Sequence, residues 1–280
     1  MLRASLATPV VVLFALALIM PLAVLLRQSL VEEGSSRFTL ANYAAVVTSL
    51  AYRRALLNSV LIAFASTALA MVLCLPVAVY IERSNSRYRN ALAVALTIPL
   101  SLPGIVIGFF VILLFGLTGA IPQLSLLLTG ERRFNFAYSF GGMLLGYLYF
   151  QIPRVVLVLR GAVSALSQDV IDVSRTLGAA PWRVYLDVLL PALFPALISA
   201  ASVSLATAFG AFGTAATLSR GFRVLPLEIA SSFTESFQVE RAASLSIALA
   251  VLTTAILLGL GRVAERAQQP RRENDTPRGS

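Results

Sequence analysis

The chain has 280 residues, of which 58% are hydrophobic and 12% charged, with a formal net charge of +9, whereas a soluble domain carries about 25% charged residues. All 22 positive residues are Arg, and the absence of Lys and His excludes a P-loop lysine, a Schiff base, a His-based dyad and a histidine metal site. The basic residues form no stripe interleaved with aromatics, so we expect a membrane protein without a nucleic-acid partner that is not an enzyme and has no catalytic residue, metal ligand or cofactor.

Six apolar runs are long enough to cross a bilayer as helices, which takes about 20 residues. They cover residues 6–26, 56–81, 91–117, 140–159, 189–211 and 242–260. The runs are continuously apolar and do not alternate with period two, so they predict membrane helices and not barrel strands. The third run contains Pro99, Pro103 and Gly104, breaks that a membrane helix tolerates where its neighbours satisfy the freed backbone groups. The sequence therefore predicts an all-α membrane protein.

The two ends of the chain are expected on the same side of the membrane, because the number of spans is even. The first run exceeds the roughly 7–15 apolar residues of a signal peptide, so we expect an uncleaved span. Twelve Arg residues lie on the side of the termini and nine on the other, which favours cytoplasmic termini. Residues 267–280 are polar and lack apolar periodicity, so we expect one membrane domain, 1–266, followed by a disordered tail.

The segment 164–187, between the fourth and fifth runs, is the one long hydrophilic interruption. Its pattern predicts two short helices. Gly178 is expected to end the first because glycine accepts a positive φ, and Pro181 suits the first turn of the second. Such an elbow can dock into a partner's groove or lie among lipid headgroups, and the pattern alone leaves both interpretations open.

The spacing of this segment resembles the EAA loop of ABC-importer permeases. The family pattern is E-A-A, three residues, Gly, nine residues, an aliphatic residue, one residue and Leu-Pro, and here it reads Asp172-Val173-Ser174, Gly178, Val188 and Leu190-Pro191. The first triplet departs from the pattern, with Asp for Glu and Val-Ser for Ala-Ala. The segments 38–43, 58–59 and 99–108 are also similar to parts of these permeases, so the resemblance covers nearly all of residues 1–265.

The resemblance implies the type I ABC importer permease fold, with six transmembrane helices and a cytoplasmic coupling-helix loop. It also implies a second permease subunit, identical or paralogous, two ATP-binding cassette ATPase subunits, and an extracytoplasmic substrate-binding protein. The expected location is a bacterial or archaeal cytoplasmic (inner) membrane, with lipid around the helices. A chain without Lys carries no Walker A site, so the ATP would be hydrolysed by the partner ATPase.

The resemblance further implies roles for individual residues of the loop, which would seat in a cleft of the ATPase. The residues implied are Asp172 and Arg175 for polar contacts, Gly178 for the turn, Ala179, Ala180, Pro181 and Trp182 for the cleft, and Leu190 and Pro191 for the start of the fifth helix. Alternatively, Asp172 and Arg175 belong to a solvated face, and Trp182 anchors the loop at the membrane interface.

Arg154 is the one ionisable residue well inside a predicted span, where a charge is costly and usually faces a cavity or a partner. It is a candidate pathway residue for anionic cargo, or else a structural partner of backbone carbonyls. The segment 209–214 adds Phe209 and Phe212 as further pathway candidates, although its small residues also suit close helix packing.

The chain looks closest to the permease branch that serves polyamines, thiamine, ferric iron and phosphonates. The expected cargo is a phosphonate or another small anion, or a polyamine. A passive channel or membrane scaffold is the alternative, although it leaves the spacing of the loop unexplained. An intramembrane hydrolase would need a nucleophile with a base or a metal, and the composition does not supply them.

Overall fold

The computed structural model describes the backbone of residues 2–35 and 37–274 and the side chains of residues 12–35 and 37–266. Within this part the chain is helical, and its one β-type pairing is an isolated bridge between Val31 and Phe38. This confirms the predicted all-α class. The chain divides into two compact units, Met1–Asn58 with Arg223–Leu252, and Ser59–Phe222 with Thr253–Ser280.

The first unit combines the beginning of the chain with a hairpin from near its end. Its core contains the buried side chains of Val46, Ala55, Leu225 and Leu245. The amide of Asn58 donates a 2.8 Å hydrogen bond to the carbonyl of Arg223, which ties the two sequence segments together. The elements are α1 (Leu2–Ser29), α2 (Ala41–Thr48), the start of α3 (Leu50–Arg83), α12 (Leu225–Thr234) and the start of α13 (Val239–Asn274).

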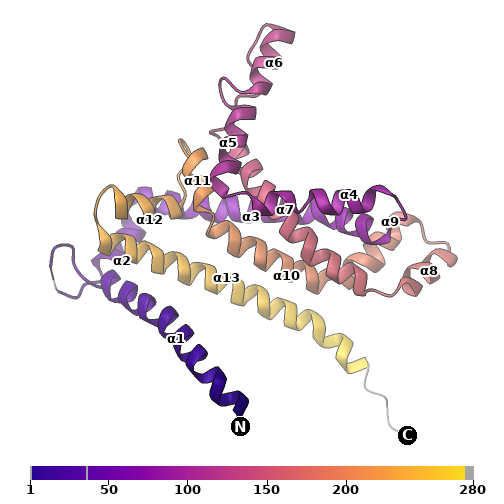
Figure 1. The fold of residues 1–280 in the computed structure, drawn as a ribbon, viewed down its shortest axis with the longest axis horizontal. Helices are drawn as coiled ribbons and strands as arrows, with labels where there is room; N and C mark the ends of the chain where they lie inside the picture. Colours follow the sequence, from indigo (N-terminus) through magenta and orange to yellow (C-terminus); the bar gives the residue numbers. More distant parts are fainter. Residues whose placement is uncertain (1, 36, 275–280) are drawn as a thin grey trace. The chain divides into compact units, whose positions relative to one another are not determined.

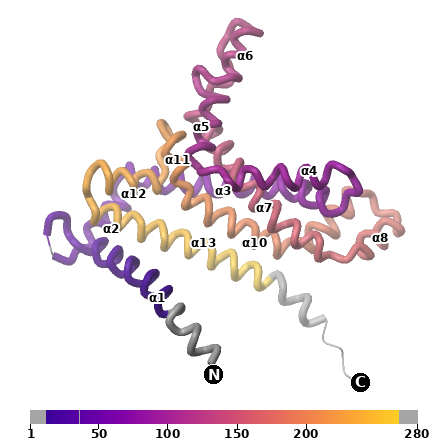
Figure 2. Tube along the Cα trace, viewed as in Figure 1, coloured from indigo at the N-terminus to yellow at the C-terminus, as the bar shows by residue number. Residues whose placement is uncertain are grey.

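The second unit contains the remainder of α3 and all the elements up to α11. In Figure 1, α7 and α10 lie side by side, with α8 and α9 together at one end of this pair. Figure 2 traces α5 and α6 as they project away from α7. The elements are α4 (Tyr88–Ala95), η1 (Ile98–Ser101), α5 (Gly104–Phe115), α6 (Ala120–Thr129), α7 (Phe140–Ala165), α8 (Gln168–Thr176), α9 (Pro181–Arg183), η2 (Val184–Leu189), α10 (Leu190–Phe209) and α11 (Phe212–Leu218).

Within the described residues, six helical stretches are long and apolar enough to cross a membrane. They are Val12–Ser29, Leu50–Arg83, Gly104–Thr129, Phe140–Ala165, Pro181–Phe209 and Val239–Arg266. The number matches the sequence prediction, and each stretch overlaps its predicted run. The predicted disordered tail, 267–280, begins inside α13, whose backbone is helical to Asn274. Residues 275–280 lie outside the described part, so the disorder of the tail stays a prediction.

The helices of the third and fifth spans start at other residues than the predicted runs do. The third span was expected at 91–117, but the chain leaves the helix at the 3₁₀ turn η1, and both Leu102 and Pro103 are extended. Proline supplies no backbone N–H and disfavours a helical residue before it, so the continuous stretch starts only at Gly104. The fifth span starts at Pro181 and not at 189, because the second short helix continues through a π-helical turn into α10.

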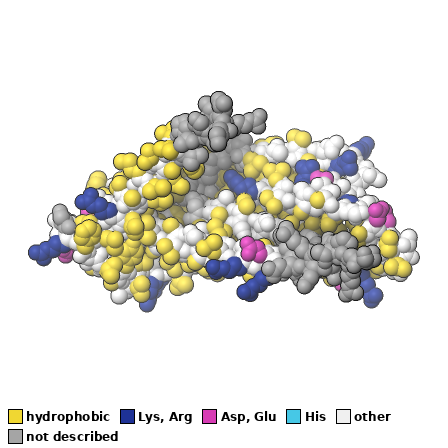
Figure 3. All heavy atoms as spheres, turned by 90° about the horizontal axis from the view of Figure 1, so that it is seen from below, with side chains coloured by type: hydrophobic (Ala, Val, Ile, Leu, Met, Phe, Trp, Pro, Cys, Tyr) yellow, Lys and Arg dark blue, Asp and Glu magenta, His cyan; other side chains and the backbone are white. Residues whose placement is uncertain are grey.

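Much of the surface is apolar, as expected for helices that face lipid. Hydrophobic side chains cover broad areas of the face drawn in Figure 3. In the first candidate span, Val12–Ser29, only 6% of the residues are buried within the chain. An exposed apolar surface of this extent is typical of a membrane or subunit interface and not of a water-soluble monomer.

A buried polar network joins α3, α7 and α10 inside the second unit. The Gln151 side chain has no solvent exposure; its amide N–H donates to the Ser66 hydroxyl at 3.0 Å and its amide oxygen accepts from the Ser204 hydroxyl at 2.8 Å. The hydroxyl of Thr67 lies 3.1 Å from that of Ser204. Because an unpaired polar group is costly in an apolar medium, the network favours one relative placement of the three helices.

The short helix α11 packs against α5 with almost no clearance, at positions where α5 has glycine. A Cβ atom on Gly104 would lie 3.1 Å from the backbone nitrogen of Thr214, and one on Gly108 would lie 2.8 Å from the Cβ atom of Thr217. Small residues permit such close helix contacts in membranes. The small residues of 209–214 therefore include a tight packing contact.

We predict that Gly108→Ala lowers the thermal stability of the purified chain, because the added methyl group collides with the β-branched side chain of Thr217. Overpacking of this kind costs about 1–3 kcal/mol. Gly161→Ala is the matched control, since a Cβ at this helical position meets nothing within 4 Å and alanine favours helix. Thermal unfolding in detergent measures both. Equal stability of the two variants would contradict the packing contact.

Candidate functional site

The segment after α7 is ordered from its first residue, because Leu166 leaves the helix and Ser167 caps the next one. The Ser167 hydroxyl accepts the backbone N–H of Asp169 at 3.2 Å. Ser at an N-cap satisfies one of the free N–H groups of a helix start, and the Asp169 carboxylate lies in the first turn, where the helix dipole favours a negative charge. Local sequence therefore defines the start of α8.

The turn between α8 and α9 depends on Gly178, whose φ is +83°. Its N–H donates to the carbonyl of Arg175 at 2.9 Å, and the N–H of Ala179 donates to the carbonyl of Ser174 at 3.1 Å. This pair of hydrogen bonds is the Schellman arrangement, which ends a helix with a left-handed residue. The positive φ expected at Gly178 is confirmed.

Beyond the turn the chain re-enters a helix without a further break. Pro181 occupies the first turn of α9, with Ala180 as the preceding extended residue. The π-helical turn η2 then leads into α10, which begins at Leu190 and has Pro191 in its first turn. The elbow, which we define as residues 167–183, is thus attached to α7 on one side and to α10 on the other.

The elbow has an inner face that packs on the chain and an outer face that is exposed. On the inner face Ile171 joins the buried cluster of α3 and α7, and Ala179 packs against the same cluster. On the outer face, Leu177 is 82% and Trp182 is 60% exposed. The Arg183 guanidinium lies over the ring of Trp182, 5.3 Å from its centre. A rigid turn therefore presents apolar side chains outward.

The predicted loop residues lie together around this turn. Asp172 and Arg175 are both exposed and lie 3.9 Å apart, a surface pair of little energetic weight. Ala179 and Ala180 are half-buried, whereas Pro181 and Trp182 are exposed. Leu177 was not among the predicted site residues, although an apolar residue directly before the turn glycine is the signal that indicates it.

A cavity of about 410 Å³ lies in the second unit, between α5, α7, α10 and α11. It brings together Arg154 and Phe212, which the sequence singled out, whereas Phe209 is buried and is not among the lining residues. The lining residues are Leu102, Gly104, Ile107, Phe150, Arg154, Thr207, Gly210, Ala211, Phe212, Gly213 and Thr214.

Arg154 contributes a positive charge to this cavity. One guanidinium nitrogen donates to the carbonyl of Phe150 at 2.6 Å, and the guanidinium lies 5.3 Å from the centre of the Phe150 ring. Among the described residues, Arg154 forms no ion pair with a carboxylate. One donor thus serves the backbone, while no carboxylate of the described residues neutralises the charge.

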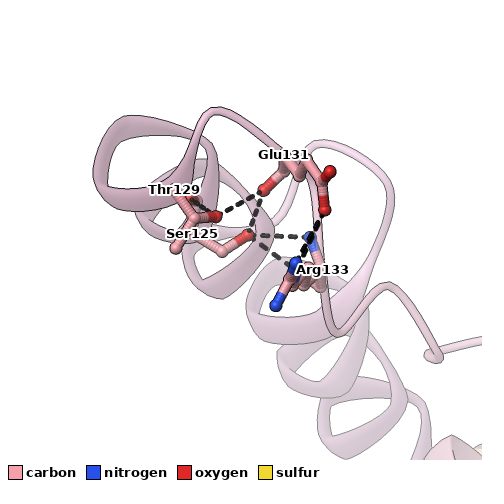
Figure 4. Close-up of polar contacts among 4 residues, drawn as sticks. All are labelled: Ser125, Thr129, Glu131 and Arg133. Atoms are coloured by element: carbon pink, nitrogen blue, oxygen red, sulfur yellow. Dashed lines mark hydrogen bonds and ion pairs between the residues drawn. The ribbon is translucent and has the colours of Figure 1, made fainter.

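A second ordered loop follows α6 and was not anticipated from the sequence. Figure 4 shows its centre, the Ser125 hydroxyl, which accepts the backbone N–H of Arg133 at 2.8 Å and lies 3.0 Å from the carbonyl of Glu131. The Arg133 and Glu131 side chains pair at 2.9 Å. Gly130 makes the turn with a φ of +75°. Side-chain hydrogen bonds thus hold an otherwise exposed turn.

Comparisons with known proteins agree with this architecture. A family model described as "binding-protein-dependent transport system inner membrane component" matches residues 74–271. The molybdenum transport system permease protein ModB of Mycobacterium tuberculosis is 33% identical over 78% of this chain and 81% of its own length. The putative 2-aminoethylphosphonate transport system permease protein PhnV of Salmonella typhimurium is 27% identical over 95% of this chain and 97% of its own length.

The fold also resembles a solved transporter subunit. One chain of a bacterial alginate ABC transporter, crystallised with an alginate-pentasaccharide-bound periplasmic protein, superposes with a TM-score of 0.80. The two chains are 16% identical, and the superposition covers 95% of this chain and 94% of the other. At this identity the likeness supports the fold, and it extends over nearly the whole chain.

We predict that Gly178→Val opens the turn, because a β-branched residue is disfavoured at φ +83° and a left-handed residue costs about 1–2 kcal/mol. Gly178→Asn is the matched control, since Asn tolerates this conformation and the space around the position is free. Amide hydrogen exchange at residues 178 and 179 should accelerate in the Val variant and change little in the Asn variant. Equal exchange rates in both variants would show that the turn does not depend on a residue that tolerates a positive φ at position 178.

Proposed function

Because the chain belongs to the family of binding-protein-dependent transport system inner membrane components, we propose that it forms the translocation pathway of an ATP-driven importer coupled to a separate ATPase through the elbow 167–183. The chain is a permease component of an ABC importer and not an enzyme, and it is a multi-pass inner membrane protein.

The outer face of the elbow is the observation that carries the proposed coupling. Leu177 and Trp182 are exposed although they belong to a hydrogen-bonded turn, and apolar anchors on a short helix suit a groove on a partner protein. Asp172 and Arg175 precede these anchors on α8, are exposed, and can exchange their weak mutual contact for contacts with the ATPase. Ala180 and Pro181 complete the docking surface.

The proposed arrangement determines the orientation of the chain. If the elbow meets the ATPase, it lies in the cytoplasm, and an even number of spans puts both termini there as well. The loop after α6 then lies on the opposite side, where a substrate-binding protein delivers its ligand. The apolar surface of α1 suits lipid or a second permease subunit, identical or paralogous, because so little of it is buried within the chain.

The cavity around Arg154 is the proposed part of the pathway, with Phe212 in its wall. A cation without a carboxylate partner favours anionic cargo, since an unneutralised charge at membrane depth is costly. A phosphonate or another small anion fits this charge better than a polyamine does, and one relative is named for transport of a phosphonate. Phe209, the other aromatic candidate, is buried and is not among the residues that line the cavity.

Uptake in proteoliposomes tests the proposed function. The permease is reconstituted with its ATPase and its binding protein, and uptake of molybdate, 2-aminoethylphosphonate and putrescine is measured with and without ATP. An importer takes up cargo only with both ATP and the binding protein. Uptake down a gradient without ATP would support the passive channel instead.

We predict that Leu177→Asp abolishes co-purification of the ATPase with the permease. The exposed side chain of Leu177 would otherwise enter an apolar groove, where an unpaired carboxylate is strongly disfavoured. Ser164→Asp is the matched control, because it adds the same charge at an exposed position at the end of α7. Loss of the ATPase in both variants would point to charge alone, and retention in both would contradict the proposed docking surface.

We predict that Arg154→Gln reduces ATP-dependent anion uptake about tenfold, the effect of one lost charged hydrogen bond. Arg154→Lys preserves the charge and should retain more of the uptake. Both variants should bind the ATPase normally, because the cavity lies away from the elbow. Unchanged anion uptake in the Gln variant would remove Arg154 from the pathway.

A further inference from the structure

The C-terminal end of α7 faces a general difficulty of helices, because the last four carbonyl groups have no partner within the helix. α7 ends at Ala165, and the chain turns away at Leu166. The Val163 side chain is fully buried at this end. Ser164 and Ala165 are exposed, so this end of the helix is only partly buried. The carbonyl of Val163 accepts the N–H of Leu166 at 3.3 Å, and further donors at this partly buried end would stabilise it.

Arg83, the last residue of α3, supplies the donors. One of its terminal nitrogens donates to the carbonyl of Val163 and to that of Leu166, both at 2.6 Å. The other terminal nitrogen donates to the side-chain oxygen of Gln168, the first residue of α8. One guanidinium therefore contacts the end of α7 and the start of α8. These contacts join residues that are some 80 positions apart in the sequence.

The charge and shape of arginine suit this position. The negative end of the α7 dipole favours a cation, and hydrogen bonds from an ionised donor are about twice as strong as neutral ones. The planar guanidinium offers five N–H groups in a fixed fork, whereas lysine offers a compact ammonium group on a flexible stem. A lysine at this position would satisfy the charge but not the three acceptors in the same way.

Two further contacts strengthen the connection between α3 and this end of α7. The neighbouring residue Glu82 pairs with Arg160 of α7 at 2.6 Å, with side-chain exposures of 21% and 31%. Ile171 of the elbow lies in the same buried cluster as Ala78 and Ile81 of α3. The inner face of the elbow is thus held to α3 by packing and its first residue by Arg83.

We propose that Arg83 is a positioning residue that fixes the elbow 167–183 to α3 and α7, so that a displacement of the elbow by the ATPase moves these helices with it. The proposal rests on the proposed function, in which the elbow meets the ATPase. Arg83 itself contacts neither ATPase nor cargo. It acts through the backbone of α7 and through Gln168.

The number of substrate molecules transported per ATP hydrolysed tests the proposal in the reconstituted transporter. In Arg83→Met we expect the ATPase to stay bound and to hydrolyse ATP, while the transport ratio falls well below that of the wild type, because the elbow has lost its hydrogen bond to α3. Arg83→Lys should fall between Met and wild type. Arg87→Gln is the matched control, because Arg87 follows α3 by four residues and its guanidinium contacts the neighbouring Tyr88 within the described part of the chain.

Three results would overturn the proposal: a wild-type ratio in Arg83→Met, an equal fall in Arg87→Gln, or full recovery in Arg83→Lys. The last two would assign the effect to charge alone. If Arg83→Met does not assemble, Gln168→Leu removes the acceptor in the elbow, together with the long 3.5 Å hydrogen bond from the Gln168 amide to Asp172. It should then lower the ratio, and a wild-type ratio in that variant would refute the connection to the elbow.

Amide hydrogen exchange in the full-length permease separates this proposal from the proposed function. Exchange in α8 should accelerate in Arg83→Met and stay at the wild-type rate in Arg87→Gln, whether or not the chain transports anything. Unchanged exchange in both would contradict the role of Arg83. If the wild-type protein shows no ATP-dependent uptake, the proposed function is refuted. The attachment of the elbow by Arg83 would not be affected by that result.

Discussion

The hydrogen bonds from Arg83 to the carbonyls of Val163 and Leu166 connect the end of α3 to the end of α7. They supply donors from one helix to the partly buried end of another. Because backbone groups at membrane depth must be satisfied inside the protein, a helix end that borders the membrane is a natural place for such a contact. The same guanidinium reaches Gln168, so the end of the membrane helix and the start of the elbow share one partner.

The helices joined in this way also contact one another deeper in the unit. Gln151 connects α7 to Ser66 of α3 and Ser204 of α10 through hydrogen bonds that leave its buried amide satisfied. The glycines of α5 let α11 approach closely, and the cavity with Arg154 lies beside this contact. Helices that are connected in this way can transmit a displacement of a surface loop to a cavity inside the membrane.

Local sequence patterns predicted the features that depend on neighbouring residues. Apolar runs of sufficient length predicted six spans. A glycine three residues before Pro181 predicted the turn at Gly178. The third span was misplaced because an apolar run continues through Pro99 and Pro103 while the helix does not. Neither Arg83 nor Leu177 was among the predicted site residues. The contacts of Arg83 are with residues some 80 positions away, which a single sequence does not reveal, whereas the position of Leu177 directly before the turn glycine was a local signal that was overlooked.

A distance measurement on the assembled transporter tests the connection between elbow and helices most directly. Two spin labels on one permease subunit, at the exposed positions Val72 of α3 and Thr176 of the elbow, report their separation by pulsed electron paramagnetic resonance. A rigid connection predicts the same separation with and without ATP, while the separation between this elbow and that of the proposed second permease subunit decreases when ATP binds. A change in the separation between the labels at Val72 and Thr176 on ATP binding would show that the elbow moves on a hinge. It would contradict a rigid connection between the elbow and α3.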